Sequence, residues 1–192
     1  MLITRAFSPD PVTRECFARY GIYDSYDCFL HYGFIDQQTP FVISIPLEIT
    51  MPSLGTLTVH ARPAQTPHTQ LPAEIADLWF YLPVFEVDRA SRSAVVSHLM
   101  IPQGNAPDAL RRILGVILRQ IEPALTERSI SAIIETIEQQ ILSANAEFYR
   151  DLAACLRDIT LPDHFTSLHR TSKEVVKLQL EKLQRYPFYP EH

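Results

Sequence analysis

The chain has 192 residues, of which 46% are hydrophobic and 20% are charged, and its formal net charge is −5. This composition is typical of a globular protein with one domain or two small ones. The negative charge argues against general nucleic-acid binding, because such binding depends on a basic surface that neutralises phosphates. A basic partner would suit this chain better.

The cysteine pattern and the lengths of the apolar segments indicate the cellular compartment of the protein. Cys16, Cys28 and Cys155 are odd in number and widely spaced, so they predict neither a disulfide framework nor a CxxC metal site. No apolar run approaches the roughly twenty residues of a membrane span, and the first ten residues lack the apolar centre of a signal peptide. We therefore expect a cytoplasmic protein with no membrane partner.

The first predicted elements are a strand and a short helix. Residues 15–20 alternate large and small side chains, as an extended strand does, and Gly21 ends the run. Asp24 or Ser25 can cap a helix of about two turns, and Gly33 stands where a left-handed residue often closes a helix. The apolar residues expected on one face of this helix are Tyr26, Phe29 and Leu30.

A β-hairpin is predicted next. Phe41–Ile49 is rich in β-branched residues and is interrupted by Pro46, which favours an edge strand or a bulge. A turn over 51–55 leads to Thr56–His60, where threonine alternates with apolar residues. His60 shares the register of the threonines, so we expect it on the solvent face rather than in a metal site.

The middle of the chain is punctuated by prolines. Residues 62–72 contain three prolines and no apolar periodicity, which predicts a linker. Residues 74–81 can form a short helix that ends in the aromatic cluster Trp79–Tyr81, either a core group or a recognition surface. Residues 92–101 resemble a strand, and the turn 102–104 follows it.

From residue 105 onward the apolar period is helical. A first helix starts after residue 105 and stops at Pro123, Thr126 can cap a second helix over 127–159, and a third helix runs from about 172 to 186. Their expected apolar stripes are Leu110, Ile113, Leu114, Ile117 and Ile121; Ile130, Ile133, Ile134, Ile137, Ile141, Phe148, Leu152, Cys155 and Ile159; and Val176, Leu180 and Leu183. The charges expected on the third helix are Lys173, Lys177, Lys182 and Arg185.

These elements predict an α+β fold. Its parts are a β-rich region over 1–61, a linker and mixed α/β connection over 62–104, and an antiparallel helical bundle over 105–192. Short connections between successive amphipathic helices are what favour the bundle.

Two Tyr-Gly pairs flank the first predicted helix, and they carry a family resemblance. The run resembles the YG-x-x-(S/N)-x-(E/D)-x-x-x-x-YGF pattern that closes the catalytic fold of SET domains of the Rubisco large-subunit methyltransferase type. The matching residues are Tyr20, Gly21, Ser25, Asp27, Tyr32, Gly33 and Phe34. The resemblance covers the carboxy-terminal half of a SET domain, and the helices after it are similar to the family's helical substrate-binding region.

The resemblance implies methyl transfer from S-adenosylmethionine to a protein lysine. Tyr32 would take the place of the catalytic tyrosine at the lysine channel, and Tyr20 would line the same substrate pocket. A fixed phenol oxygen can orient a neutral amine and stabilise the charge that develops on it, without a metal or a covalent intermediate. The alternative is that both tyrosines are half-buried aromatic residues beside turn glycines.

The cofactor motifs of the family are absent from the sequence. SET enzymes bind S-adenosylmethionine through a Gly-x-Gly segment and an Asn-His pair, whereas the five glycines of this chain never form Gly-x-Gly. Asn105 and Asn145 are both followed by alanine. The cofactor-binding residues are therefore unknown, and we expect the isolated chain to be inactive unless a complementing chain completes the site.

Two other functions stay open at this point: a non-catalytic protein-binding module, and a structural homo-oligomer that covers an exposed sheet edge with a second copy. The seven histidines show no HExxH spacing and no Gly-x-Ser-x-Gly elbow is present, so zinc and hydrolase chemistry are not indicated.

Overall fold

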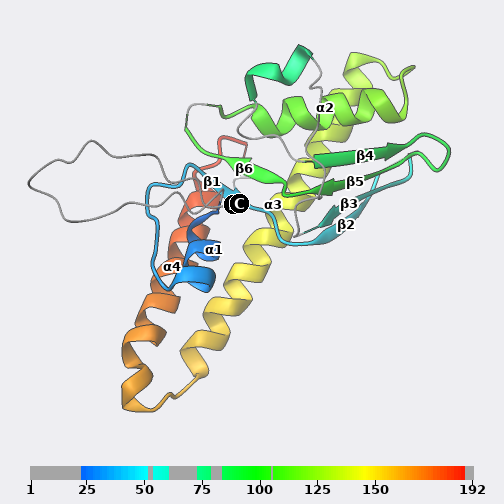
Figure 1. The fold of residues 1–192 in the computed structure, drawn as a ribbon. Helices are drawn as coiled ribbons and strands as arrows, with labels where there is room; N and C mark the ends of the chain where they lie inside the picture. Colours follow the sequence, from blue (N-terminus) through cyan, green and yellow to red (C-terminus); the bar gives the residue numbers. More distant parts are fainter. Residues whose placement is uncertain (1–22, 52–53, 61–72, 79–83, 105, 189–192) are drawn as a thin grey trace, which may run out of the picture.

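The computed structural model describes residues 23–51, 54–60, 73–78, 84–104 and 106–188. Two small β-sheets and four α-helices are arranged along these residues (Figure 1), so the α+β prediction is confirmed at the coarse level. The predicted strand over 15–20, the linker over 62–72 and the aromatic cluster Trp79–Tyr81 lie outside the described residues. Within the described part, no helix is both long enough and apolar enough to cross a membrane.

The larger sheet has four strands in the order β2-β3-β5-β4: β2 (Leu47–Thr50), β3 (Thr56–His60), β5 (Ser93–Ser97) and β4 (Val84–Asp88). The predicted hairpin is confirmed, because β2 and β3 pair antiparallel; β3 and β5 are parallel. Gly55 is needed at this turn, since a Cβ there would lie 2.5 Å from a carbonyl oxygen of Arg92. His60 is exposed, as its register predicted.

The smaller sheet pairs β1 (Phe41–Ile43) with β6 (Met100–Pro102). The strand predicted over Phe41–Ile49 is thus two strands in two sheets. Pro46 lies between them, and it has no backbone N–H to donate a hydrogen bond to a neighbouring strand. The strand β2 lies at the edge of its sheet, as expected. The strand predicted over 92–101 is likewise broken, at His98, whose φ is 64°.

Helix α2 (Ala109–Ile121) joins the sheets to the long helices. Its predicted stripe is buried, and α2 contacts the short 3-10 helix η1 (Ala73–Leu78), the strands β4, β5 and β6, and the helix α3. Part of the helix predicted over 74–81 is therefore this 3-10 turn. The helix α2 begins at Ala109, later than predicted, and ends just before Glu122 and Pro123.

Helix α3 (Glu127–Asp158) and helix α4 (Thr166–Gln184) form a long pair, connected through the short 3-10 helix η2 (Asp163–Phe165). Thr126 caps α3 as predicted, its side chain accepting a hydrogen bond from the Ser129 backbone N–H at 3.2 Å. The third helix begins six residues before the predicted residue 172.

The predicted stripe of α3 is only half correct. Its first part, from Ile130 to Ile141, is buried except for the partly buried Ile133, but Phe148, Cys155 and Ile159 are exposed. None of the side chains of residues 150–174, all of which the structure describes, is buried. We call residues 150–174 the helical arm; it extends away from the sheets in Figure 1.

Helix α1 (Ser25–Tyr32) lies against α4, and β1 contacts α4 as well. The amino-terminal part of the described chain is thus held by its last helix. Phe29 and Tyr26 pack partly against the core, whereas Leu30 is 58% exposed, so the predicted apolar face of α1 is only partly correct.

Candidate functional site

Tyr32 lies on the last turn of α1, in a surface group of aromatic rings. Its ring centroid is 5.6 Å from that of Tyr23, 6.1 Å from that of His31 and 6.0 Å from that of Phe34, with which it is stacked. The Tyr32 side chain is 41% exposed. This tyrosine is therefore accessible from solvent. Tyr20, the second predicted site residue, lies outside the described residues.

Local capping fixes where α1 ends and hence where Tyr32 stands. Gly33 follows the helix with φ at 76°, and its backbone N–H donates to the Phe29 carbonyl at 2.9 Å. This left-handed position suits glycine because it has no Cβ. The predicted C-cap at Gly33 is confirmed.

Asp24 begins α1 and is almost completely buried, with 1% of its surface exposed. Its Oδ1 accepts hydrogen bonds from the backbone N–H groups of Tyr26 and Asp27, each at 2.9 Å. Its Oδ2 accepts from the Ile43 backbone N–H at 2.9 Å and from the Gln179 side-chain amide at 2.6 Å. Burial raises the pKa of Asp24, and these four hydrogen bonds oppose that rise. One carboxyl group thus joins α1, β1 and α4.

Lys182 and Ser25 form a second buried contact between α1 and α4. The Lys182 ammonium donates to Ser25 Oγ at 2.7 Å, and Ser25 Oγ donates to the Asp36 carbonyl. Burial lowers the pKa of Lys182, although the nearby Asp24 carboxylate opposes this. Such a pair is able to activate a serine nucleophile, but Ser25 is fully buried. The contact therefore holds α4 against α1.

Asn145 fixes the connection between β1 and β2 onto α3. Its Oδ1 accepts from the Ile45 backbone N–H at 3.0 Å, and its Nδ2 donates to Ser44 Oγ at 3.0 Å and to the Ile141 carbonyl at 2.8 Å. Asn145 is fully buried. Its position four residues after Ile141, on the buried stripe, was the available sequence signal, since a polar residue there needs a partner.

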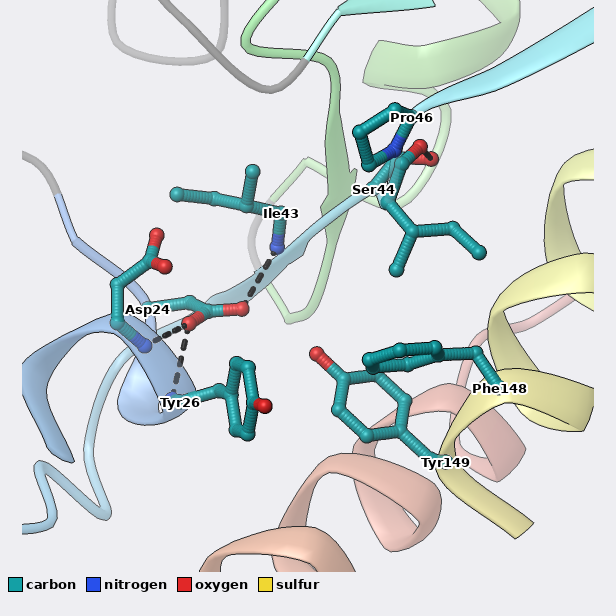
Figure 2. A pocket seen from close by; sticks show the side chains of 9 residues that line it. Asp24, Tyr26, Ile43, Ser44, Pro46, Phe148 and Tyr149 are labelled. Atoms are coloured by element: carbon teal, nitrogen blue, oxygen red, sulfur yellow. Dashed lines mark hydrogen bonds between the residues drawn. The ribbon is translucent and has the colours of Figure 1, made fainter. Parts of the chain in front are cut away.

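A cavity of about 380 Å³ lies where the start of α1, the 43–46 segment and α3 meet. The side chains of Asp24, Tyr26 and Tyr149 converge on it in Figure 2, with Phe148 beside Tyr149. Asp27 contributes to the same wall. Sequence reasoning missed this cavity, because its lining residues come from segments more than 100 positions apart along the chain.

Three rings form one side of the cavity. The ring centroids of Tyr26 and Tyr149 are 5.6 Å apart, and those of Tyr26 and Phe148 are 6.3 Å apart. Phe148 and Tyr149 lie 5.1 Å apart, and the three interplanar angles are 82°, 86° and 74°. Burial is the main cause that raises the pKa of both tyrosines, so their hydroxyl groups stay protonated at neutral pH.

The described residues include no group of three or more histidine, cysteine, aspartate or glutamate side chains placed to hold a metal ion. The comparisons with known proteins give no identity either: no protein-family model, no curated protein and no solved structure matches this chain.

Proposed function

We propose that this chain is the carboxy-terminal portion of a SET-type protein-lysine methyltransferase. The observation that supports the proposal is α1 itself: a short helix capped by Asp24 and closed by a left-handed Gly33, with an exposed Tyr32 between the two and the strand β1 after them. These are the later elements of the succession that the resemblance implies; the strand over 15–20 and the first Tyr-Gly pair lie outside the described residues.

In this proposal the Tyr32 hydroxyl acts on the substrate amine. It orients the neutral lysine nitrogen toward the methyl group and stabilises the positive charge that develops as the new bond to carbon forms. Tyr20 lines the same pocket, and the substrate is a protein. The net charge of −5 suits a substrate with a basic surface.

The glycines of this chain do not fit the S-adenosylmethionine motif of the family. Of the four glycines in the described residues, Gly33 and Gly104 have φ near 75° in turns, Gly55 packs against a carbonyl and Gly115 lies inside α2. None belongs to a Gly-x-Gly segment. The proposal therefore assigns the cofactor site to a complementing chain.

The test is co-expression of this chain with the polypeptide encoded immediately upstream. The pair should bind S-adenosylmethionine in calorimetric titration with micromolar affinity and should transfer its tritiated methyl group to lysine residues of a basic protein substrate. Neither activity is expected from the isolated chain. An upstream region without Gly-x-Gly and Asn-His segments, or a co-expressed pair that does not bind the cofactor, would refute the proposal.

Replacing Tyr32 tests its role within that pair. Tyr32→Phe should lower kcat about 100-fold, the usual effect of removing one group that stabilises transition-state charge, and should leave cofactor affinity unchanged. Tyr23→Phe is the matched control, because it removes a hydroxyl from the neighbouring ring. Equal loss in both variants would contradict a specific role for Tyr32.

A structural homo-oligomer is the second candidate, and the end of the helical arm favours it. The exposed apolar side chains there are Ile159, Leu161, Phe165 and Leu168, between 39% and 51% exposed. Apolar groups in this arrangement are suited to a contact with a second copy. Light scattering should then show a dimer that Leu168→Lys dissociates, and a monomer at high concentration would exclude it.

A further inference from the structure

The cavity beside Asp24 is separate from Tyr32. Asp24 and Tyr32 are the two ends of α1, and eight residues of helix span about 12 Å at 1.5 Å per residue. Tyr32 does not contribute to the lining of the cavity. An occupant of this cavity therefore has a different role from a substrate at Tyr32.

The cavity has the size and the walls of a small-ligand site. Its volume of about 380 Å³ lies within the roughly 300–1,000 Å³ of known ligand pockets. The rings of Tyr26, Phe148 and Tyr149 meet at steep angles, so they enclose a corner rather than form a flat stack. Phe148 is 37% exposed, which leaves this side reachable from solvent.

The charged side chains in the cavity lining are acidic, although burial raises the pKa of both carboxyl groups. Asp24 and Asp27 belong to this lining, and no lysine, arginine or histidine is found among the described residues that form it. Lys182 interacts with Asp24 and His31 with Asp27, but neither basic side chain belongs to the lining. Neither carboxyl group forms an ion pair within the described part of the chain. Negative charge beside aromatic faces is the environment in which organic cations bind.

The hydrogen bonds indicate which cation fits. A carboxylate offers about four acceptor positions, and the four donors to Asp24 already occupy them. A primary ammonium group has three N–H donors that each need an acceptor. A quaternary ammonium group has none, so it uses the charge of Asp24 and the ring faces without displacing any of these bonds.

The fully buried Gln179 side chain adds an independent observation. Its Nε2 donates to Asp24 and, at 3.4 Å, to the Tyr149 hydroxyl, while its Oε1 accepts no hydrogen bond in the described structure. Gln179 is not part of the lining, but its amide group contacts two residues that are, Asp24 and Tyr149.

We propose that this cavity binds a methylated, quaternary ammonium group, held by the rings of Tyr26, Phe148 and Tyr149 and by the charges of Asp24 and Asp27. Two sources share this chemistry: a free small molecule with a trimethylammonium head, and a trimethylated lysine side chain of a protein.

Titration of the isotope-labelled 192-residue chain, followed by NMR, tests the proposal with choline as the probe. Its neutral analogue of the same shape is 3,3-dimethylbutan-1-ol. Choline should shift the amide signals of residues 24–27, 43–45 and 148–149 with a dissociation constant in the millimolar range, as for other small ligands, and the alcohol should bind at least about fivefold more weakly. n-Butylammonium should also bind more weakly than choline.

Two matched pairs of variants locate the site. Phe148→Leu should weaken choline binding about fivefold because it removes one ring face, whereas Phe165→Leu, in the helical arm, should not change it. Asp27→Asn should weaken choline binding by a similar factor. Asp151→Asn removes an exposed charge nearby on α3 and should leave choline binding unchanged. These substitutions keep the four hydrogen bonds of Asp24.

A short peptide carrying trimethyllysine separates the two sources. Binding at least about tenfold tighter than choline would assign the site to a modified protein, and equal affinity would assign it to a free amine. Equal binding of choline and the neutral alcohol would show an apolar cavity only, and no saturable shift with any of the probes would show that nothing binds; either result overturns the proposal. Both are independent of methyl transfer, so they leave the proposed function untouched.

Discussion

The surroundings of the Asp27 side chain disfavour the ionised form of its carboxyl group. Burial, and then the nearby Asp24 carboxylate, raise its pKa from 3.8 to about 6, while His31 opposes the rise. The folded protein therefore keeps the Asp27 proton to a higher pH than the unfolded chain does. Any stability due to the neutral form is complete below pH 3.8 and is lost as the pH rises through 6.

Asp27→Asn should accordingly raise the free energy of unfolding at pH 7.5 by about 1 kcal/mol and change it little at pH 4. The pKa difference would correspond to about 3 kcal/mol, which we reduce because Asp27 is partly exposed to solvent. Urea denaturation at both pH values measures the effect. The exposed Asp151→Asn should show no such dependence on pH, and an equal effect of Asp27→Asn at both values would contradict the explanation.

Glu138 is a buried acidic group, 1% exposed, whose removal we also expect to change stability. Its carboxylate accepts a hydrogen bond from Arg111 Nε at 2.9 Å and from the Tyr186 hydroxyl at 2.6 Å, and the Arg111 guanidinium stacks on Phe188 at 3.5 Å. Glu138 therefore attaches the end of the described chain to α2 and α3.

Glu138→Ala should lower the free energy of unfolding by about 2 kcal/mol, because it leaves the buried Tyr186 hydroxyl without its partner and removes the ion pair of Arg111, whose side chain is 34% exposed. Glu135→Ala, on the exposed side of α3, is the matched control and should change it by less than about 0.5 kcal/mol. Chemical denaturation at pH 7 gives both values. Similar losses in the two variants would mean that the buried network adds no stability.

Individual residues could be predicted where their partners are close in sequence. The cap at Asp24 and the left-handed Gly33 depend on neighbours within five residues, and both are confirmed. Lys182 was expected among the charges of the third helix, but it is only 5% exposed and donates to Ser25, which lies 157 positions earlier in the chain. No local pattern contains that information.

At the level of elements, two glycines test when a helix requires glycine: Gly33 lies just after the end of α1, and Gly115 lies inside α2. Gly33→Ala should destabilise the protein by about 1 kcal/mol, because nothing lies within 4 Å of the new Cβ and the entire cost comes from the positive φ. Gly115→Ala, inside α2, should instead stabilise it by about 0.5–1 kcal/mol, since its Cβ would make ordinary contacts at 3.5–3.6 Å. Thermal unfolding of both variants checks the opposite signs.

The strands were predicted at the right places but as elements that were too long. Pro46 and the backbone at His98 each divide one predicted strand between the two sheets. A proline reveals a possible break in the sequence, whereas a positive φ at histidine does not. The early start of α4 was missed because its first residues have no buried stripe that would mark them as helical.

At the scale of the whole molecule, stability should differ between the body and the helical arm. Amide hydrogens of residues 150–165 should exchange at least about 100-fold faster than those of residues 134–146, because the arm has no buried side chains to resist local opening. Within the arm, one contact between α3 and α4 is the hydrogen bond between the His169 ring and the Leu156 carbonyl at 2.6 Å. Hydrogen exchange followed by mass spectrometry measures this, and uniform protection along α3 would contradict it.

The order of the elements, but not their packing, could be read from the sequence. The hairpin and the three carboxy-terminal helices are present in the predicted order. The contact of α4 with α1 and β1 was not predicted, because apolar stripes show that a helix is covered without showing what covers it. The cavity beside Asp24 depends on that contact and on Asn145, so it could not be foreseen either.

The attachment of α4 to α1 also has a consequence during synthesis. Asp24 and Ser25 are among the first described residues to leave the ribosome, but their partners Gln179 and Lys182 follow 155 and 157 positions later. Until then Asp24 lacks the hydrogen bond from Gln179 and α1 lacks the helix against which it packs, while contacts between α2 and the sheets can already form. Docking of α1 is therefore expected only after α4 has left the ribosome, and a chain that ends before α4 would leave α1 without its main support.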